Sequence, residues 1–220
     1  MLQRRRTFPQ ERYDTCQRDA SCWDSCQFAA RSGVLNFRQM PAKLSFKPVT
    51  ASTWKDFEAL FEAKGAPSYC WCMAWRPLED RQKASRIQRK KAMHERVKKR
   101  VPIGILAYEA GEPVGWCSVA PRETMLRMSR DQDEEESGVW SVVCFYVPRA
   151  RRGEGLSEKL LEAAVNLAFK RGARVVEGYP VAKGSPSYRF MGYLPLFKGR
   201  GFTETGRAGS RRHVVRKTKR

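Results

Sequence analysis

Two closely spaced glycines, Gly153 and Gly155, are the residues of this 220-residue chain whose spacing most clearly suggests chemistry. Glycine lets a backbone approach a ligand closely, and the first N–H groups of a helix have no partner inside the helix. The helix dipole favours negative charge at that end, and Arg151 and Arg152 stand beside the glycines. The segment 152–157 therefore predicts a cradle for a pyrophosphate group. A tight strand-to-helix turn without a ligand is the plainer alternative.

Two familiar nucleotide-binding motifs fit this segment less well. The dinucleotide fingerprint needs a third glycine, which is missing here. The P-loop needs a Gly-Lys-Ser or Gly-Lys-Thr sequence, which the chain lacks.

A strand and a helix must hold the cradle in place. Residues 139–147 form an apolar run without clean alternation, which is typical of a strand buried on both faces. Residues 155–171 repeat apolar side chains at helical spacing, and Gly172 ends the predicted helix. The cradle is therefore expected between a buried strand and an amphipathic helix.

The rest of the pattern predicts one α/β domain. A hairpin is expected from residues 103–108 and 113–119, which flank a turn that contains glycine. The other predicted strands are 41–49, 174–181, 202–207 and 211–217, and the other predicted helices are 50–64, 78–100 and 194–198. This order predicts a mixed sheet with helices on both sides.

The first 39 residues differ in pattern from the rest of the chain. They show no sustained period of two or 3.6 residues, so we expect an extension with little stable structure, or a true start at Met40. The domain would then span residues 40–220. Cys16, Cys22 and Cys26 lack the second pair that a zinc site requires, so no metal is expected.

The net charge of +20 is concentrated in residues 81–100 and 198–220. Such a field attracts polyanions, although no base-stacking aromatic residues are interleaved with these charges. A solvated basic surface is an equally simple interpretation. No run of about 18 apolar residues exists, and no apolar stretch follows the basic N-terminus. We therefore expect no membrane span, no secretory signal and a cytoplasmic location.

Two motifs resemble those of the GNAT superfamily of N-acetyltransferases. Residues 152–161 resemble its motif A, Gln/Arg-x-x-Gly-x-Gly/Ala, although Ser157 replaces the final small residue. Residues 196–202 resemble its second signature, a Tyr-x-x-x-Gly-Phe-like turn. Segments 70–76, 115–122 and 176–180 resemble one bacterial subgroup. The resemblance implies an α/β (α+β) fold, with a central mixed, mostly antiparallel sheet of about six to seven strands between helices.

The resemblance also implies that acetyl-CoA is the co-substrate. The cradle amides would hold its pyrophosphate, the end of the buried strand would pair with its pantetheine arm, and the amide near Phe145 would polarise the thioester carbonyl. The implied CoA-binding residues are Cys144, Phe145, Tyr146, Val147, Arg151, Arg152, Gly153, Glu154, Gly155, Leu156 and Ser157. A primary amine of the acceptor would then attack the acetyl group directly, without a metal.

The proton-transfer residues are less clearly indicated. Many family members use the Tyr of the second signature as general acid, but this chain has Phe197 there, which has no proton to donate. Our candidate acid is Tyr188, with Tyr179, Tyr193 and solvent as alternatives. Our candidate base is Glu177, ahead of Glu123, although a strand carboxylate is often simply an ion-pair partner.

Residues 69–76 are expected over the acceptor side. We interpret Trp71, Met73 and Trp75 as pocket walls and Arg76 as a ligand for a carboxylate, and core packing of this loop is the alternative.

Two other functions stay open at this point. One is a catalytically silent acyl-CoA-binding protein, which Phe197 permits. The other is a nucleic-acid-binding module that uses the two basic stretches. The acceptor is not indicated, and neither is the oligomeric state, for which a homodimer is one option.

Overall fold

The computed structural model describes residues 43–130, 132 and 135–219, which contain a seven-stranded sheet in the order β1-β2-β3-β4-β5-β7-β6. Neighbouring strands are antiparallel except β4 and β5, which are parallel. The strands are β1 (Ser45–Pro48), β2 (Ile105–Glu109), β3 (Glu112–Pro121), β4 (Val139–Tyr146), β5 (Val175–Gly178), β6 (Thr203–Ala208) and β7 (Arg212–Thr218). The expected mixed, mostly antiparallel sheet is confirmed.

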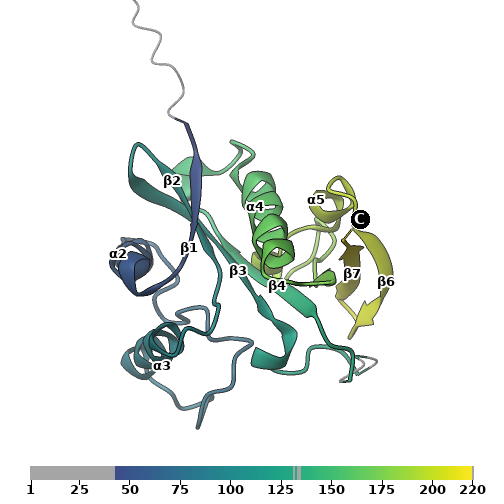
Figure 1. The fold of residues 1–220 in the computed structure, drawn as a ribbon, viewed down its shortest axis with the longest axis horizontal. Helices are drawn as coiled ribbons and strands as arrows, with labels where there is room; N and C mark the ends of the chain where they lie inside the picture. Colours follow the sequence, from purple (N-terminus) through teal and green to yellow (C-terminus); the bar gives the residue numbers. More distant parts are fainter. Residues whose placement is uncertain (1–42, 131, 133–134, 220) are drawn as a thin grey trace, which may run out of the picture. The chain divides into compact units, whose positions relative to one another are not determined.

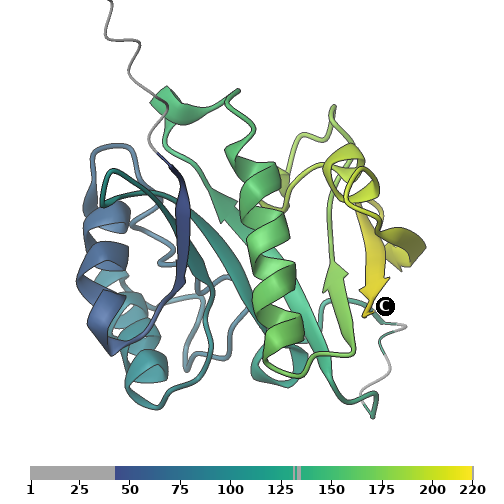
Figure 2. The same cartoon turned by 45° about the horizontal axis from the view of Figure 1, so that its top comes forward.

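Helices cover both faces of this sheet, as Figures 1 and 2 show. They are α2 (Trp54–Glu62), α3 (Arg86–Lys98), α4 (Leu156–Lys170) and α5 (Leu194–Lys198). The apolar stripe of α4 includes Leu160 and Ala164, which are fully buried in one cluster with Val142. On the other face, α2 and α3 contribute Phe57 and Met93 to a second buried cluster. The sheet is therefore a middle layer, and each of its faces carries its own core.

The helix predicted over 78–100 is wrong in its first part. α3 begins only at Arg86, because Ser85 and Gln88 form a reciprocal cap: the Ser85 N–H donates to the Gln88 side chain at 2.7 Å, and the Gln88 N–H donates to the Ser85 hydroxyl at 3.3 Å. The preceding residues form turns, with Asp80 at φ 45°. Local capping chemistry therefore outweighs the helix propensity of the basic run.

β4 leaves β5 half-way along its length. The two strands pair only as far as Val142 and Gly178. Beyond Gly178 the chain bonds to the start of β7 instead. β4 stays paired with β3 on its other side, with a bulge at Val143. Residues 143–146 therefore present a strand edge that none of the described strands covers.

A third apolar cluster lies on the sheet face opposite α4. It contains Val143 at the bulge, Tyr179 just after β5 and Val214 of β7. Trp75 and Cys144 pack against it. This cluster joins the open edge of β4 to the last hairpin and to the loop that precedes α3.

Several expectations fall at or beyond the limits of the described residues. The predicted extension, residues 1–39, its cysteines and Met40 lie outside them. Among the residues that are described, no helix has the length and apolar character of a membrane span. The same residues hold no group of three or more His, Cys, Asp or Glu side chains placed to bind a metal ion.

Candidate active site

The cradle lies between β4 and α4, after a short 3-10 turn at Arg149–Arg151. Gly153 and Gly155 have φ values of 89° and 71°, in the left-handed region that disfavours other residues. A Cβ built on either glycine meets nothing within 4 Å, so both face open space. Within the described chain, the N–H groups of residues 153–157 donate to no backbone carbonyl. The loop therefore offers a run of free amides at the start of a helix, as an anion site requires.

The two arginines of the cradle are both engaged by the protein itself. Arg151 pairs with Glu109 at 2.6 Å and with Glu154 at 2.8 Å, and these carboxylates raise its pKa. Arg152 donates from Nε to the Val147 carbonyl at 3.2 Å. The arginines therefore brace the loop, and the free amides are the groups left to contact a ligand.

The residues expected to line the pantetheine arm lie on the open edge of β4. Because of the bulge, Val143 and Cys144 both face away from α4, whereas Phe145 faces the α4 cluster. Tyr146 returns to the opposite face, in the cluster of α2 and α3. The edge therefore offers backbone groups along its length and side chains on both faces of the sheet.

The side chain of Phe197 packs where β4 and β5 diverge, on the sheet face that α4 covers. Its ring is fully buried, with its centroid 5.1 Å from that of Phe202 and 6.1 Å from that of Phe145. A Cβ on Gly178 would lie 2.3 Å from this ring, and one on Gly192 would lie 2.9 Å from it. The aromatic ring thus occupies the position of the signature Tyr, without a hydroxyl.

Glu177 lies on the opposite face of β5 and is 4% exposed. Its carboxylate is 3.1 Å from Arg216 Nε and 3.7 Å from an Arg122 nitrogen, and it accepts a hydrogen bond from the Tyr179 hydroxyl. Burial and the Glu177 charge raise the pKa of Tyr179, so this phenol keeps its proton. Glu177 also lines a cavity of about 210 Å³ between the β5–β7–β6 strands and the loop before β4. The candidate base is therefore a buried, paired carboxylate in the wall of this cavity.

The loop expected over the acceptor side is largely interior. Trp71 and Met73 are fully buried in the cluster of α2 and α3, so they form core rather than pocket walls. Arg76 is also fully buried, and it donates to the Cys72 and Ile103 carbonyls and to the Ser118 hydroxyl. The interpretation of Arg76 as a ligand for an acceptor carboxylate does not fit this position, because the side chain is sealed in the core and both terminal nitrogens already donate to protein oxygens, while Nε is buried without a partner. Of the four predicted residues, Trp75 is the one that is part-exposed.

Trp75 meets Tyr188 and a residue that the sequence did not single out, Arg212. The ring centroids of Trp75 and Tyr188 are 6.3 Å apart, and the Arg212 guanidinium lies over both rings. Tyr188 is 37% exposed and has φ 59°. The charge pattern of residues 198–220 did not distinguish Arg212 from its basic neighbours, since its role depends on contacts with two distant loops.

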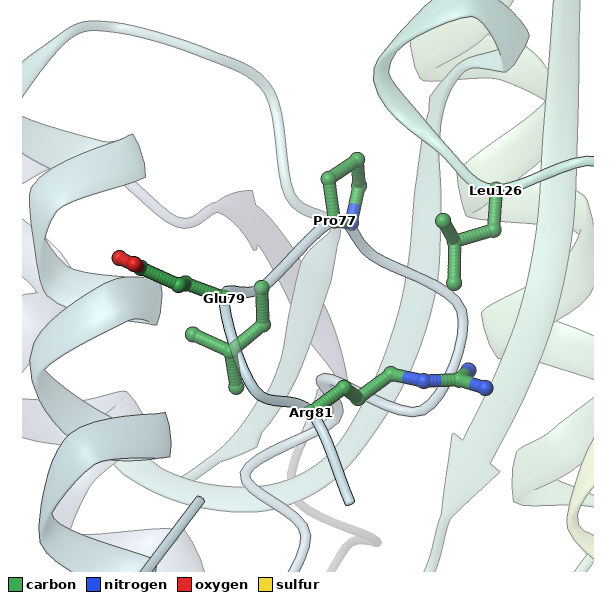
Figure 3. A pocket seen from close by; sticks show the side chains of 5 residues that line it. Pro77, Glu79, Arg81 and Leu126 are labelled. Atoms are coloured by element: carbon green, nitrogen blue, oxygen red, sulfur yellow. The ribbon is translucent and has the colours of Figure 1, made fainter. Parts of the chain in front are cut away.

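A shallow hollow of about 490 Å³ lies just beyond Arg76. It is lined by Pro77, Leu78, Glu79, Arg81 and Leu126. Figure 3 shows Glu79 and Arg81 pointing in opposite directions, and Arg81 is held by the Ala74 carbonyl at 2.8 Å. No polar groups converge there, so we place the chemistry at the edge of β4.

Comparison with known proteins agrees with this geometry. The sequence profile of the acetyltransferase (GNAT) family matches residues 54–192. The chain belongs to the GNAT family. A search of curated proteins gives no match. Among solved structures, the aminoglycoside acetyltransferase AAC(6')-Ib, in complex with paromomycin and acetyl-CoA, is similar to this GNAT protein. The two are 18% identical, the match covers 80% of this chain and 94% of the other, and the TM-score is 0.54.

Two further structures are similar to this GNAT protein. An uncharacterized protein from Bacillus halodurans is 14% identical over 80% of this chain and 84% of the other, with a TM-score of 0.51. PH1933 from Pyrococcus horikoshii is 16% identical over 81% of this chain and 99% of the other, with a TM-score of 0.50. At these identities the likeness establishes the fold of the GNAT protein and leaves its acceptor to be inferred from its own residues.

Proposed function

We propose that this protein transfers an acetyl group from acetyl-CoA to a primary amine of its acceptor. The observation that supports this most is the position of the free amides of residues 153–157 next to the uncovered edge of β4. A pyrophosphate on those amides would leave the pantetheine arm beside residues 144–147. The structural relative AAC(6')-Ib has been crystallised with acetyl-CoA, which is consistent with this proposal.

In this proposal the backbone of β4 activates the thioester. The arm adds to the open edge as an extra strand would, and a free N–H near Phe145 donates to the thioester carbonyl as negative charge develops on its oxygen. The bulge at Val143 supports this arrangement, because a bulge leaves backbone groups without partners in the ladder.

Proton transfer is assigned to the face opposite α4. Glu177 is the proposed base that takes a proton from the attacking amine, and Tyr188 is the proposed acid that donates one to the departing CoA sulfur. Phe197 has no exchangeable proton, and both proposed residues flank the third apolar cluster through Tyr179 and Trp75. With both transfers complete, the products are the N-acetylated acceptor and CoA thiol.

Calorimetry of acetyl-CoA binding tests the cofactor half of this proposal. Gly155→Glu places bulk and negative charge in the cradle, so we expect binding to weaken by about tenfold or more. Gly209→Glu is the matched control, because Gly209 has φ 73°, open space around it and a place in the β6–β7 turn. Failure of the unaltered protein to bind acetyl-CoA would refute the proposal.

One observation favours a second function. Because Phe197 replaces the usual proton donor, the protein would also suit a role as an acyl-CoA-binding protein without turnover. Thiol release from acetyl-CoA, measured over a panel of amines, separates the two. Binding without thiol release from any amine would favour the silent binder.

A further inference from the structure

Three side chains from distant parts of the chain meet on the face opposite α4. The Arg212 guanidinium carbon lies 4.7 Å from the Trp75 ring centroid and 5.2 Å from that of Tyr188. Trp75 belongs to the loop before α3, Tyr188 to the loop after β5, and Arg212 opens β7. The guanidinium thus lies over two neighbouring aromatic rings, an arrangement that stabilises a cation.

Two donors in this group have no acceptor. Arg212 uses Nη2 to bond the Met128 carbonyl at 3.0 Å, but Nη1 is buried without a partner. The indole Nε1 of Trp75 is likewise buried and unpartnered. Buried donors left unpaired are costly, and their occurrence in a native site calls for an explanation. Ring stacking accounts for the position of the cation but leaves both N–H groups unsatisfied.

No acidic side chain of the described residues supplies the missing acceptor. No carboxylate pairs with Arg212 in that part of the chain. Glu177, on the same sheet face, is already held by Arg122 and Arg216. The groups that act on Arg212 electrostatically are the phenols of Tyr188 and Tyr179, while burial lowers its pKa. Among the described residues, the site therefore holds a cation that no carboxylate pairs.

The position of the group connects it to the proposed chemistry. Arg212, Val214 and Arg216 alternate along β7, so their side chains share one face of the sheet. Arg216 contacts Glu177, and Arg212 lies four residues before Arg216, about 13 Å away from it along β7. Trp75 packs against the cluster that contains Val143, at the open edge of β4. An acceptor anchored at Arg212 would therefore extend towards that edge.

We propose that this group is the acceptor-binding site and that the acceptor is an amine which also bears a carboxylate. The carboxylate accepts hydrogen bonds from Arg212 Nη1 and Trp75 Nε1. Tyr188 and Phe190, which are 37% and 41% exposed, provide aromatic surface at the rim. This inference rests on the proposed acetyl transfer for its biological meaning, but the carboxylate site itself is testable without turnover.

Binding of a non-reacting probe tests the site directly. 3-Phenylpropionate combines an aromatic ring with a carboxylate, and 3-phenylpropionamide has the same size without the charge. We expect the carboxylate to bind at least about tenfold more tightly in calorimetry, since hydrogen bonds to charged groups are the stronger ones. Equal affinity for the two probes, or no binding of the carboxylate, would overturn the proposal.

Variants assign the preference to residues. Arg212→Gln removes the charge, and Trp75→Phe removes the indole N–H while keeping a smaller aromatic ring, so both are expected to reduce the preference for the carboxylate probe by about tenfold. Arg211→Gln is the matched control, because this neighbour donates to the Ser187 hydroxyl instead. Thermal melts confirm that each variant is folded. A preference that survives in folded Arg212→Gln contradicts the assignment.

Kinetics separate this inference from the proposed function. With amino acids and their carboxamides as acceptors, we expect the free carboxylate to lower KM in the unaltered protein and Arg212→Gln to raise KM with little change in kcat. If acetyl-CoA binds but carboxylate and carboxamide are used equally, the acceptor inference fails while acetyl transfer stands. If acetyl-CoA does not bind but the probe preference holds, the proposed function fails and the carboxylate site remains.

Discussion

Replacing Cys72 by Ser should change how the stability of this protein depends on pH. Arg76 is fully buried, and its donors reach only neutral oxygens of Cys72, Ile103 and Ser118. A buried cation needs a compensating negative charge. The ionisable group beside it is the thiol of Cys72, whose sulfur accepts a hydrogen bond from Trp116 Nε1 at 3.3 Å.

The surroundings of Cys72 favour its thiolate. A hydrogen bond from the Cys144 thiol, the charge of Arg76 and the Trp116 N–H together lower the pKa of Cys72 from 9.0 to about 6, against the opposing effect of burial. Three pKa units correspond to about 4 kcal/mol. Because the folded pKa is depressed, this stabilisation is complete above about pH 9 and is lost as the pH falls through about 6. The free energy of unfolding should therefore rise with pH across this window, by up to about 1.4 kcal/mol per pH unit.

Urea unfolding between about pH 6 and pH 8.5 measures this slope. Cys72→Ser should flatten it, because serine does not ionise in this range. Cys70→Ser is the matched control, since burial and the nearby Cys72 raise the pKa of Cys70 and keep that thiol protonated throughout. If unaltered protein and Cys72→Ser show parallel pH profiles, Cys72 is not the counter-ion of Arg76.

Other perturbations test further parts of the site. Gly178→Ala should cost about 1–3 kcal/mol, because its Cβ would lie 2.3 Å from Phe197, whereas Gly206→Ala, with open space around it, should be nearly neutral in the same urea titration. Glu177→Gln should lower kcat by about a hundredfold and leave acetyl-CoA affinity unchanged; retained kcat would remove Glu177 as the base. Tyr188→Phe should lower kcat with little change in acetyl-CoA affinity, and an unaltered kcat would return the proton-donor role to solvent. A chain that begins at Met40 should keep its melting temperature and acetyl-CoA affinity, and loss of either would show that residues 1–39 belong to the functional domain.

The sequence was most informative where a signal is local. The apolar spacing of residues 156–168 predicts α4, because a helix buried on one face repeats apolar residues every three to four positions. The continuous apolar run 139–147 predicts β4, because a strand buried on both faces needs no polar alternation. The glycines of the cradle are visible for a similar reason, since a positive φ restricts residue choice. In the same way, the family resemblance rests on motifs that are continuous in sequence, and the profile match confirms the family.

What the sequence could not predict depends on contacts between distant segments. Arg76 and Arg212 both lie near aromatic residues, yet the side chain of Arg76 is fully buried in the core and that of Arg212 is part-exposed. Composition alone does not separate them, because burial is decided by how the loop before α3 packs on β3 and β7. The bulge at Val143 could not be predicted either. In a run of apolar residues without alternation, one extra residue changes no pattern that would reveal it.

The position of Phe197 determines from which side a proton can reach the sulfur in the proposed reaction. Its ring closes the angle between β4 and β5 on the α4 side, together with Phe145 and Phe202. The side chains that fill this position, Phe145, Phe197 and Phe202, carry no hydroxyl. The protonated phenol of Tyr179 and the part-exposed Tyr188 lie on the opposite face, where Glu177 and Arg212 also lie. In the proposed reaction, loss of the signature hydroxyl would thus bring proton transfer and acceptor binding together on a single face of the sheet.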